Sequence, residues 1–319
     1  MKKATQREKN PYKNSDSNKR YFTYEYYLRQ TFGQKCAKIP IDAGFTCPNI
    51  DGRCGHGGCI YCAGDFSPSS AKSIAEQYEA GREKLSKKWK SDRNIVYFQA
   101  HTNTYAPVCI LKEKFEAALR LPDVVGLNIA TRADCLEDEK LAYLAELAER
   151  TVLTLELGLQ SADDETAKRI NRGHDFAVFS DAVERIRRAS GKINICVHMI
   201  FGLPGEITEG MLASIKKLAA LRPDQVKFHM LYVMENTPLG KMFLEGEYEP
   251  IAREDFISAA ANALTLLPPQ TVVARITGDG AGEGMLAPEW SRRKIAVIND
   301  IDKYLFENDL WQGKFYREN

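Results

Sequence analysis

The stretch FTCPNIDGRCGHGGCIYC, residues 45–62, holds four of the eight cysteines of the chain. Their spacing is Cys47-x6-Cys54-x4-Cys59-x2-Cys62. The stretch follows the first expected strand, at the end of the strand where α/β barrels carry their active sites. Its glycines, at positions 52, 55, 57 and 58, allow the backbone to wrap closely around a bound group.

The residue types in this loop leave three interpretations open. A zinc ion would take all four thiolates in a tetrahedral arrangement. A [4Fe–4S] cluster can take three thiolates and leave one iron open for another ligand. A reduced loop without metal is the third interpretation.

The 319-residue chain has the composition of an ordinary globular protein, with 44% hydrophobic and 27% charged residues. Its net charge of +1 argues against a generic polyanion binder. It has no apolar run of about 18 residues, so we expect no membrane-spanning helix. Residues 1–20 are basic but lack the apolar core of a secretory signal, so we expect a cytoplasmic protein. In that compartment, clustered cysteines more often bind metal or do redox work than form disulfides.

Short apolar or β-branched runs alternate along the chain with longer segments of helical period. Such alternation favours an α/β fold of parallel strands joined by right-handed crossovers. Six or seven units of this kind predict a barrel or partial barrel. A doubly wound open sheet is the alternative, but no strand is followed by GxGxxG. The expected strands are 38–42, 95–99, 125–131, 152–157, 193–200, 225–231 and 272–276, and the expected helices are 71–89, 111–118, 137–149, 164–171, 177–190, 208–221 and 253–266.

The chain divides into three expected parts. Residues 1–20 are a flexible, basic leader, with seven Lys/Arg against two Asp/Glu. Residues 21–290 form the partial barrel and begin with an aromatic, amphipathic helix over 21–32. Residues 291–319 form a C-terminal helical extension packed on the barrel. Its helix over 292–307 is expected to present one apolar face, made of Ile295, Ile298, Ile301 and Leu305.

Three of the loop cysteines, Cys47, Cys59 and Cys62, match C-x11-C-x2-C, the expanded cluster motif of radical S-adenosylmethionine (radical SAM) enzymes. Tyr61 stands just before the last cysteine, as in that superfamily. Within the superfamily, the chain resembles the bacterial YtqA/YhcC group, which is related to the elongator catalytic subunit and to oxygen-independent coproporphyrinogen oxidase. The resemblance begins near residue 29 and extends to about residue 316. It implies a partial (β/α)6-type radical SAM barrel, with Cys54 as a free thiol.

The resemblance also implies a chemistry. The three cysteines would hold a [4Fe–4S] cluster, and S-adenosylmethionine (SAM) would bind its open iron. The reduced cluster would cleave SAM to methionine and a 5′-deoxyadenosyl radical, which would abstract hydrogen from a carbon of the substrate. The electron would come from a donor such as a flavodoxin or ferredoxin.

Polar residues follow three further expected strands. Residues 102–104, Thr-Asn-Thr, resemble the Thr-Pro-Thr of the coproporphyrinogen oxidase relatives, with Asn in place of Pro. Arg132 and Asp134 indicate either a polar site or a helix N-cap by Asp134. Gln160 lies twelve residues before Arg172, a spacing that also occurs in those relatives, where both residues contact SAM. The resemblance implies that Arg172 pairs with the SAM carboxylate.

Residues 200–206, Ile-Phe-Gly-Leu-Pro-Gly-Glu, resemble the strand that lies against adenine in the family, where glycine lets the backbone approach a flat ring. His198 stands where relatives often carry an Asp toward the ribose. Glu156 lies within an apolar strand, where an unpaired charge is costly, so we expect it to have a partner. The implied SAM contacts are Tyr61, Asn103, Thr104, Glu156, Gln160, Arg172, His198 and Gly202, and the candidate substrate contacts are His229, Tyr232 and Arg275.

The elongator-like resemblance implies tRNA as the substrate, with the C5 side chain of a wobble uridine as the candidate target. The basic leader and the cluster at 292–294 are candidate phosphate contacts. Two alternatives stay open. One is a radical SAM enzyme that acts on a small metabolite or tetrapyrrole. The other is a non-redox RNA-binding protein whose loop binds zinc through all four cysteines.

Overall fold

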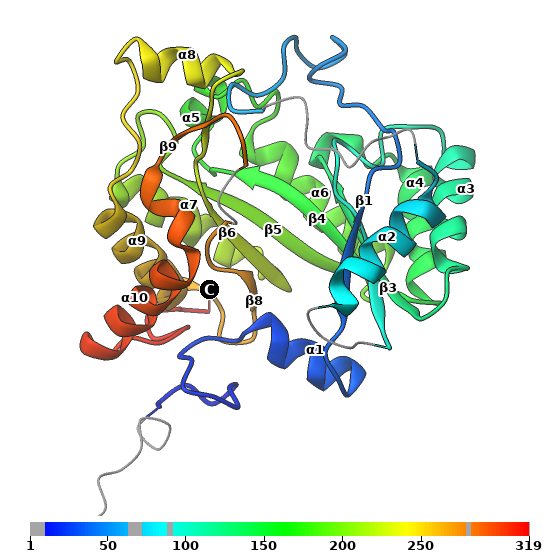
Figure 1. Cartoon of the computed structure of the whole chain (residues 1–319), viewed down its shortest axis with the longest axis horizontal. Coiled ribbons are helices and arrows are strands. Elements are labelled where there is room, and N and C mark those ends of the chain that lie inside the picture. Colours follow the sequence, from blue (N-terminus) through cyan, green and yellow to red (C-terminus); the bar gives the residue numbers. More distant parts are fainter. Residues whose placement is uncertain (1–9, 63–71, 88–91, 279–281, 319) are drawn as a thin grey trace, which may run out of the picture.

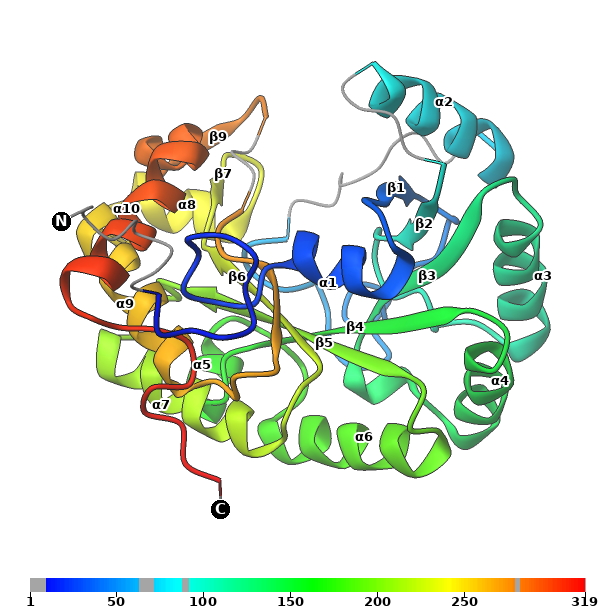
Figure 2. The ribbon, with the colours of Figure 1, turned by 90° about the horizontal axis from the view of Figure 1, so that it is seen from below.

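The protein is built on one parallel sheet. A computed structural model describes residues 10–62, 72–87, 92–278 and 282–318. Its main sheet has seven strands that lie side by side in sequence order, every neighbouring pair parallel. Figure 2 shows the sheet curving like a horseshoe. The strand order makes β1 and β8 its two edges. The strands are β1 (Ala37–Ile41), β2 (Asn94–Phe98), β3 (Val124–Thr131), β4 (Val152–Gln160), β5 (Asn194–Phe201), β6 (Gln225–Met230) and β8 (Val272–Arg275).

Helices between the strands cover the outer face of this half-barrel (Figures 1 and 2). Side chains at their N-termini explain where several of them begin, since Ser73, Asp163 and Asp175 each accept a backbone N–H of the first turn. The helices are α2 (Ile74–Ser86), α3 (Val108–Leu119), α4 (Asp138–Ala148), α5 (Asp164–Arg169), α6 (Phe176–Ala189), α7 (Thr208–Ala220) and α9 (Arg253–Leu266). The expected α/β half-barrel is therefore confirmed. The ends of the helix expected over 71–89 lie outside the described residues.

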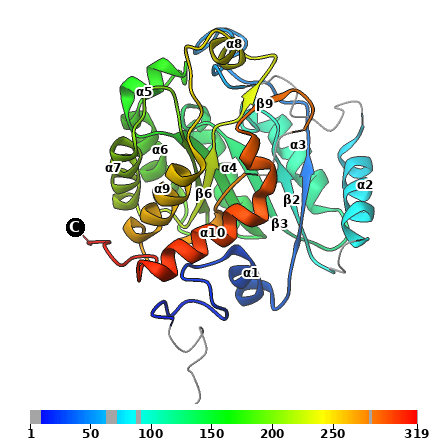
Figure 3. The ribbon, with the colours of Figure 1, turned by 60° about the vertical axis from the view of Figure 1, so that its left-hand side comes forward.

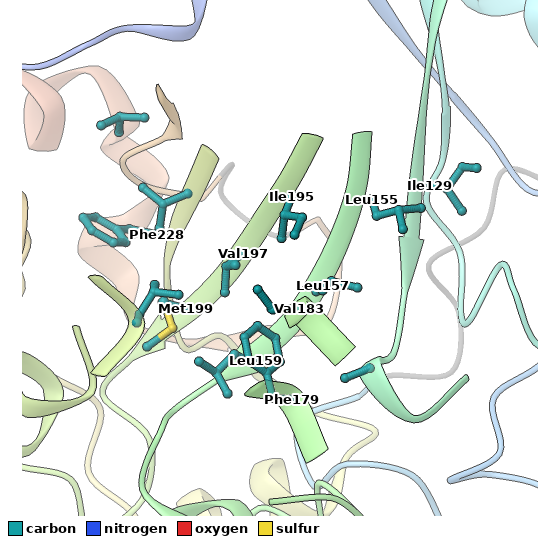
Figure 4. Close-up of a cluster of buried hydrophobic side chains, with 14 of the residues drawn as sticks. Ile129, Leu155, Leu157, Leu159, Phe179, Val183, Ile195, Val197, Met199 and Phe228 are labelled. Atoms are coloured by element: carbon teal, nitrogen blue, oxygen red, sulfur yellow. The ribbon is translucent and has the colours of Figure 1, made fainter. Parts of the chain in front are cut away.

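The apolar core lies between the sheet and these outer helices. Alternate residues of β4 and β5, among them Leu155, Leu157 and Val197, point toward Phe179 and Val183 of α6 (Figure 4). Because side chains alternate along a strand, the residues between them point into the half-barrel. There the sequence places polar and charged residues, namely Lys38, Asn128, Glu156, His198 and Lys227.

Helix α1 (Tyr24–Phe32) lies across the lower end of the half-barrel (Figures 1 and 2). Its buried residues Leu28 and Phe32 pack with Cys36 and Ile95 at the beginning of the sheet. The segment before it pairs with the last strand, since Val273 N donates to Phe22 O at 2.8 Å. Apolar packing by α1 therefore covers the N-terminal ends of the strands.

A second, small unit lies near the opposite end of the sheet (Figure 1). Strands β7 (Val233–Met234) and β9 (Met285–Ala287) pair antiparallel, and helix α8 (Pro238–Leu244) follows β7. Leu239 N of α8 donates to Ile60 O in the cysteine loop at 2.9 Å. The sequence did not predict this unit, which packs over the loop after β1.

The terminal regions differ in part from expectation. Of the expected flexible leader, residues 1–9 lie outside the described residues, and residues 10–20 pack on the C-terminal region. Tyr12 donates its hydroxyl to Pro269 O at 2.6 Å, and the buried Arg20 donates to Leu310 O at 3.2 Å. Residues 10–20 therefore contact the rest of the protein, and the flexible leader stays a prediction.

The C-terminal helix α10 (Lys294–Glu307) directly follows the 3-10 helix η2 (Glu289–Arg293) and packs along α9 (Figure 3). Another 3-10 helix, η1 (Ala133–Cys135), lies between β3 and α4. Its expected apolar face was wrong at one position, because Ile295 is 75% exposed. The buried positions are Val297, Ile301 and Leu305, spaced four residues apart. The domain limits at 20/21 and 290/291 stay predictions. No helix in the described ranges is long and apolar enough to cross a membrane.

Candidate functional site

The cysteine loop is fixed to the rest of the protein by two asparagines. Asn49 Nδ2 donates to Asn171 O at 2.6 Å and lies 3.7 Å from Cys59 Sγ. Asn171 Nδ2 donates to the loop carbonyls of His56 and Gly58 at 3.0 and 2.7 Å. Asn171 has φ +53°, in the left-handed region that Asn tolerates better than most residues. The loop after β1 is therefore held against the segment after α5.

The four loop cysteines are not equivalent. Cys59 is buried, Cys47 and Cys62 are half-buried, and Cys54 is exposed. Burial, followed by the neighbouring thiols of Cys59 and Cys47, raises the pKa of Cys62 to about 11. These three thiols therefore lie within electrostatic reach of one another. The Cys54 thiol faces elsewhere, and burial followed by the nearby Asp134 carboxylate raises its pKa.

The loop thiols are not arranged as a compact tetrahedral zinc site. With Zn–S bonds of about 2.3 Å, the sulfurs of a tetrahedral zinc site lie about 3.8 Å apart. Among the described residues, one group of possible metal ligands has its atoms within 4.8 Å of one another. It consists of Glu156, Cys196 and His198. No three loop cysteines are that close. Burial and the neighbouring thiols raise the pKa of Cys62, and a metal centre would reverse this effect because it ionises coordinating thiols.

Arg172 and Gln160 meet over the end of β4, beside the loop. Arg172 is 5% exposed, and its Nη2 donates to Gly158 O. A Cβ atom at position 158 would lie 2.6 Å from Gln160 Nε2 and 3.1 Å from Arg172 Nη2, so both side chains cross the strand where it has none. The Arg172 charge also lowers the pKa values of Tyr61 and Cys62, so its guanidinium lies within electrostatic reach of the cysteine loop.

The buried Arg172 Nε has no hydrogen-bond partner among the described residues. A buried donor without an acceptor is costly, and a guanidinium is suited to bind a carboxylate. The residues present at this end of β4 therefore fit an anionic group beside a cysteine-bound cluster.

Arg132 supports Arg172 from the third strand end. It makes two hydrogen bonds to Asp134, at 2.8 and 2.7 Å, and its Nη1 donates to Arg172 O at 2.9 Å. Asp134 lies inside η1, whereas α4 begins at Asp138, so Asp134 does not cap α4. The interpretation of Asp134 as the N-cap of α4 is therefore wrong, and the polar site stays a prediction.

Glu156 has the partners that its burial demands. Its Oε1 accepts from Lys38 Nζ at 2.5 Å and from Asn128 Nδ2 at 2.6 Å. Its Oε2 accepts from His198 Nε2 at 2.8 Å and from Lys227 Nζ. Burial alone would raise the pKa of Glu156, but Lys227 and Lys38 outweigh it and hold the pKa well below its usual value. Glu156 is therefore an anion at neutral pH.

Two histidines lie beside this carboxylate on the inner face of the sheet. The rings of His198 and His229 have centroids 5.2 Å apart. Burial, followed by the Lys227 charge, lowers the pKa of His198 to about 4. Burial, His198 and then Arg275 hold the pKa of His229 well below its usual value. Both rings are neutral at physiological pH, and two candidate substrate residues, His229 and Arg275, are close to His198.

The remaining predicted residues lie around this region. Asn103 Nδ2 donates to three carbonyls at the ends of β2 and β3, and the Thr104 hydroxyl donates to Cys135 O at 2.6 Å. Their side chains thus hold the strand ends together. Asn103 Oδ1 is buried and has no hydrogen-bond partner in the described ranges. Gly202 has φ +84°, and its carbonyl accepts from Tyr248 at 2.7 Å. Tyr232 lies against Gly278, just after β8.

Several site residues were missed by sequence reasoning. Three of them lie within expected strands, where they alternate with the apolar residues of the core. The period-two alternation would therefore have placed Lys38, Asn128 and Lys227 inside the half-barrel. The loop anchors Asn49 and Asn171 carry no such pattern, because their partners are backbone carbonyls distant in sequence.

The lowered pKa of His198 predicts that the free energy of unfolding depends on pH on the acid side. The pKa of His198 is depressed from 6.5 to about 4, so the unfolded chain takes up a proton between these values while the folded protein does not. The unfolding free energy therefore falls as pH drops through this window. Relative to His198→Gln, the wild type should lose roughly 1–2 kcal/mol between pH 7 and pH 5. Urea denaturation at both pH values measures this difference, and a difference that stays constant with pH contradicts the neutral, buried His198.

Comparison with known protein families gives two adjoining matches. Residues 49–218 match the family described as the Radical SAM superfamily, and residues 223–307 match the Radical_SAM C-terminal domain. The first match alone spans more than half of the chain.

Individual proteins are similar over most or part of the chain. The uncharacterized protein YtqA of Bacillus subtilis is 43% identical over 97% of this chain and 96% of its own length. Protein YhcC of Escherichia coli is 34% identical over 89% of this chain and 91% of its own length. A tRNA uridine(34) acetyltransferase of Methanocaldococcus infernus is 29% identical over 49% of this chain and 29% of its own length.

Among solved structures, the archaeal Methanocaldococcus infernus Elp3 with an N-terminal deletion has the same fold. It superposes with a TM-score of 0.66 at 20% sequence identity, and the match covers 87% of this chain and 64% of that one.

Proposed function

Because this chain belongs to the radical SAM superfamily, whose members use a [4Fe–4S] cluster and SAM, we propose that it modifies tRNA, with the C5 side chain of a wobble uridine as the target. Cys47, Cys59 and Cys62 are the proposed cluster ligands. One observation supports the cluster and SAM site most strongly. Three thiols lie near Arg172 at the end of β4, and Arg172 Nε has no hydrogen-bond partner among the described residues.

The bound cluster and SAM supply reductive cleavage and a 5′-deoxyadenosyl radical. The chain positions them. Arg172 and Gln160 are placed to bind the SAM carboxylate beside the cysteine loop, and Arg132 orients Arg172 through its carbonyl. Gly202, just after β5, is the proposed adenine contact, and its lack of a side chain lets Ile251 pack against the backbone there. The neutral His198 can donate or accept a hydrogen bond without adding charge.

The other proposed SAM contacts stand on position alone. Tyr61 lies within the loop next to Cys62, and Asn103 and Thr104 lie at the end of β2. Glu156 is part of the ion cluster inside the half-barrel, so we assign it the role of holding Lys38 and Lys227 rather than a direct SAM contact. His229, Tyr232 and Arg275 remain the proposed substrate contacts.

Replacing Arg172 should weaken SAM binding without loss of the cluster. A hydrogen bond to a charged group contributes about 1.5–3 kcal/mol, so Arg172→Gln should raise the Kd for SAM roughly 10- to 150-fold. Equilibrium dialysis of the reconstituted protein with labelled SAM measures this. The matched control is Arg188→Gln on the exposed surface of α6, which should leave the Kd unchanged. A Kd for Arg172→Gln within twofold of the wild type contradicts the assignment.

The support for tRNA is the similarity to a tRNA uridine(34) acetyltransferase over about half of this chain. The fold shared with archaeal Elp3 agrees with it. We also propose a cytoplasmic location and a flavodoxin or ferredoxin as the reductant that radical SAM chemistry needs.

Nucleoside analysis of tRNA from a strain that lacks this gene tests the proposal. We expect one modified uridine to disappear and its precursor to accumulate, with restoration by the wild-type gene and not by a Cys59→Ala gene. An unchanged nucleoside profile rejects tRNA and favours a small metabolite or tetrapyrrole as the substrate.

A further inference from the structure

The ions inside the half-barrel do not balance. Two ammonium groups, those of Lys38 and Lys227, share the single carboxylate of Glu156. The third ionisable partner of that carboxylate, His198, is neutral because burial and Lys227 lower its pKa to about 4. Among the described residues of this cluster, two ammonium groups therefore share one carboxylate, and a positive charge inside the protein is costly without a counterion.

The Glu156 carboxylate has no capacity left for these cations. Each of its oxygens already accepts two hydrogen bonds. An ammonium carries three donors, whereas the one hydrogen bond of Lys38 to a described residue goes to Glu156. Its nearest other neighbours are the rings of Tyr97 and Tyr24, with centroids 4.2 and 5.6 Å from Nζ. Lys38 thus keeps N–H donors that no oxygen of the described residues accepts.

These donors are accessible and lie close to the proposed SAM site. The Lys38 side chain is 22% exposed, and the His198 side chain is 17% exposed. On β4, Gly158 lies two residues beyond Glu156 on the same face, a step of about 7 Å. Arg172 binds the Gly158 carbonyl and borders the cysteine loop. A group bound to Lys38 would therefore lie about two strand residues deeper in the half-barrel than the region where SAM is proposed to bind.

The neutral His229 adds a second donor or acceptor to this part of the half-barrel. Its Nε2 atom is buried and has no hydrogen-bond partner among the described residues. A ring nitrogen of this kind can donate to an oxygen without the repulsion that a second carboxylate would bring.

We propose that Lys38, Lys227 and His229 form an oxyanion site inside the half-barrel that binds a carboxylate or phosphate of the substrate. The anion site itself does not depend on the proposed function. The identity of the molecule that carries the anion does rest on it. Seated there, the anion would fix the substrate by its charged end and present the attached carbon toward the proposed SAM site. The excess charge makes the substrate part of the electrostatic balance of the site.

Protection of Lys38 from an amine-reactive reagent tests the site in the wild-type holoenzyme. The protein with cluster and SAM is treated with acetic anhydride in sodium chloride, and then with sodium acetate or sodium phosphate at equal ionic strength. Peptide mass spectrometry reads the labelling of Lys38 against Lys216, an exposed lysine on α7. We expect saturable protection of Lys38 by at least fivefold with one of the two anions and none of Lys216.

The two arms identify the source of the anion. Protection by acetate alone indicates a carboxylate on the substrate, and protection by phosphate alone indicates a phosphate. Equal labelling of Lys38 in all three salts overturns the proposal. A Lys38→Gln variant gives an independent reading, because the anion should raise the melting temperature of the wild type and of Lys216→Gln but not that of Lys38→Gln. An equal rise in Lys38→Gln also overturns it.

A third arm separates this site from the proposed function. tRNA from the deletion strain is added in place of the small anion. Protection of Lys38 by tRNA supports both proposals. Protection by a small anion but not by tRNA leaves the oxyanion site standing and counts against tRNA as the substrate.

Discussion

Cys59→Ala should abolish the iron–sulfur cluster, whereas Cys54→Ala should keep it. Cys59 is buried between Asn49 and the other two inner thiols, and Cys54 is exposed beside Asp134. With two thiolates left, the cluster loses one of its three protein ligands. We expect iron content and the visible absorbance of the reconstituted Cys59→Ala protein to fall to background, together with SAM cleavage.

Cys54→Ala is the matched control, since it removes a thiol from the same loop. Its iron content and its rate of SAM cleavage should stay within twofold of the wild type. Equal loss of metal in both variants, with zinc as the metal, contradicts the assignment of three ligands and supports a four-thiolate site.

Glu156→Leu should be among the most destabilising single substitutions in the sheet. The variant keeps the buried Lys227 and the half-buried Lys38 on the inner face without their shared carboxylate. Removal of one partner from a buried ion pair costs about 3–5 kcal/mol, because it leaves an uncompensated charge. Anaerobic urea denaturation of the purified protein measures this loss.

A triple variant provides the comparison. Lys38→Met, Glu156→Leu and Lys227→Met together replace the ions by apolar side chains of similar length, which is often neutral for stability. We expect the triple variant to recover most of the loss while it fails to turn over substrate. If Glu156→Leu alone loses less than about 1 kcal/mol, the carboxylate is not the counterion that the geometry describes.

The sequence predicts the architecture well because each element depends on local pattern. The expected strand 225–231 is observed as Gln225–Met230, and the helix expected over 253–266 is α9. Strand β4 continues to Gln160, beyond its expected end at residue 157, since Gly158 still pairs with the neighbouring strand. The unit of β7 and β9 escaped prediction because its strands are two and three residues long and far apart in sequence.

The site was predictable where a motif spans neighbouring residues. Cys47, Cys59 and Cys62 share one loop, and Gln160 and Arg172, which the family resemblance indicates, both lie near Gly158; their roles as ligands stay predictions. The partners of Glu156 could not be predicted, because Lys38 and Lys227 come from β1 and β6 and meet it only when the sheet curves. The helix face of α10 was wrong at Ile295 because the first turn of that helix lies at its exposed end.

The central claim is that three cysteines leave one iron open, to which SAM binds beside Arg172. Pulsed electron–nuclear double resonance of the reduced protein with ¹⁵N- and ¹⁷O-labelled SAM tests it most directly. We expect hyperfine coupling of the cluster spin to the amino nitrogen and a carboxylate oxygen of SAM, present in Cys54→Ala as well. A reduced cluster whose spectrum is unchanged by labelled SAM, or a protein that holds stoichiometric zinc in place of iron, would contradict the account.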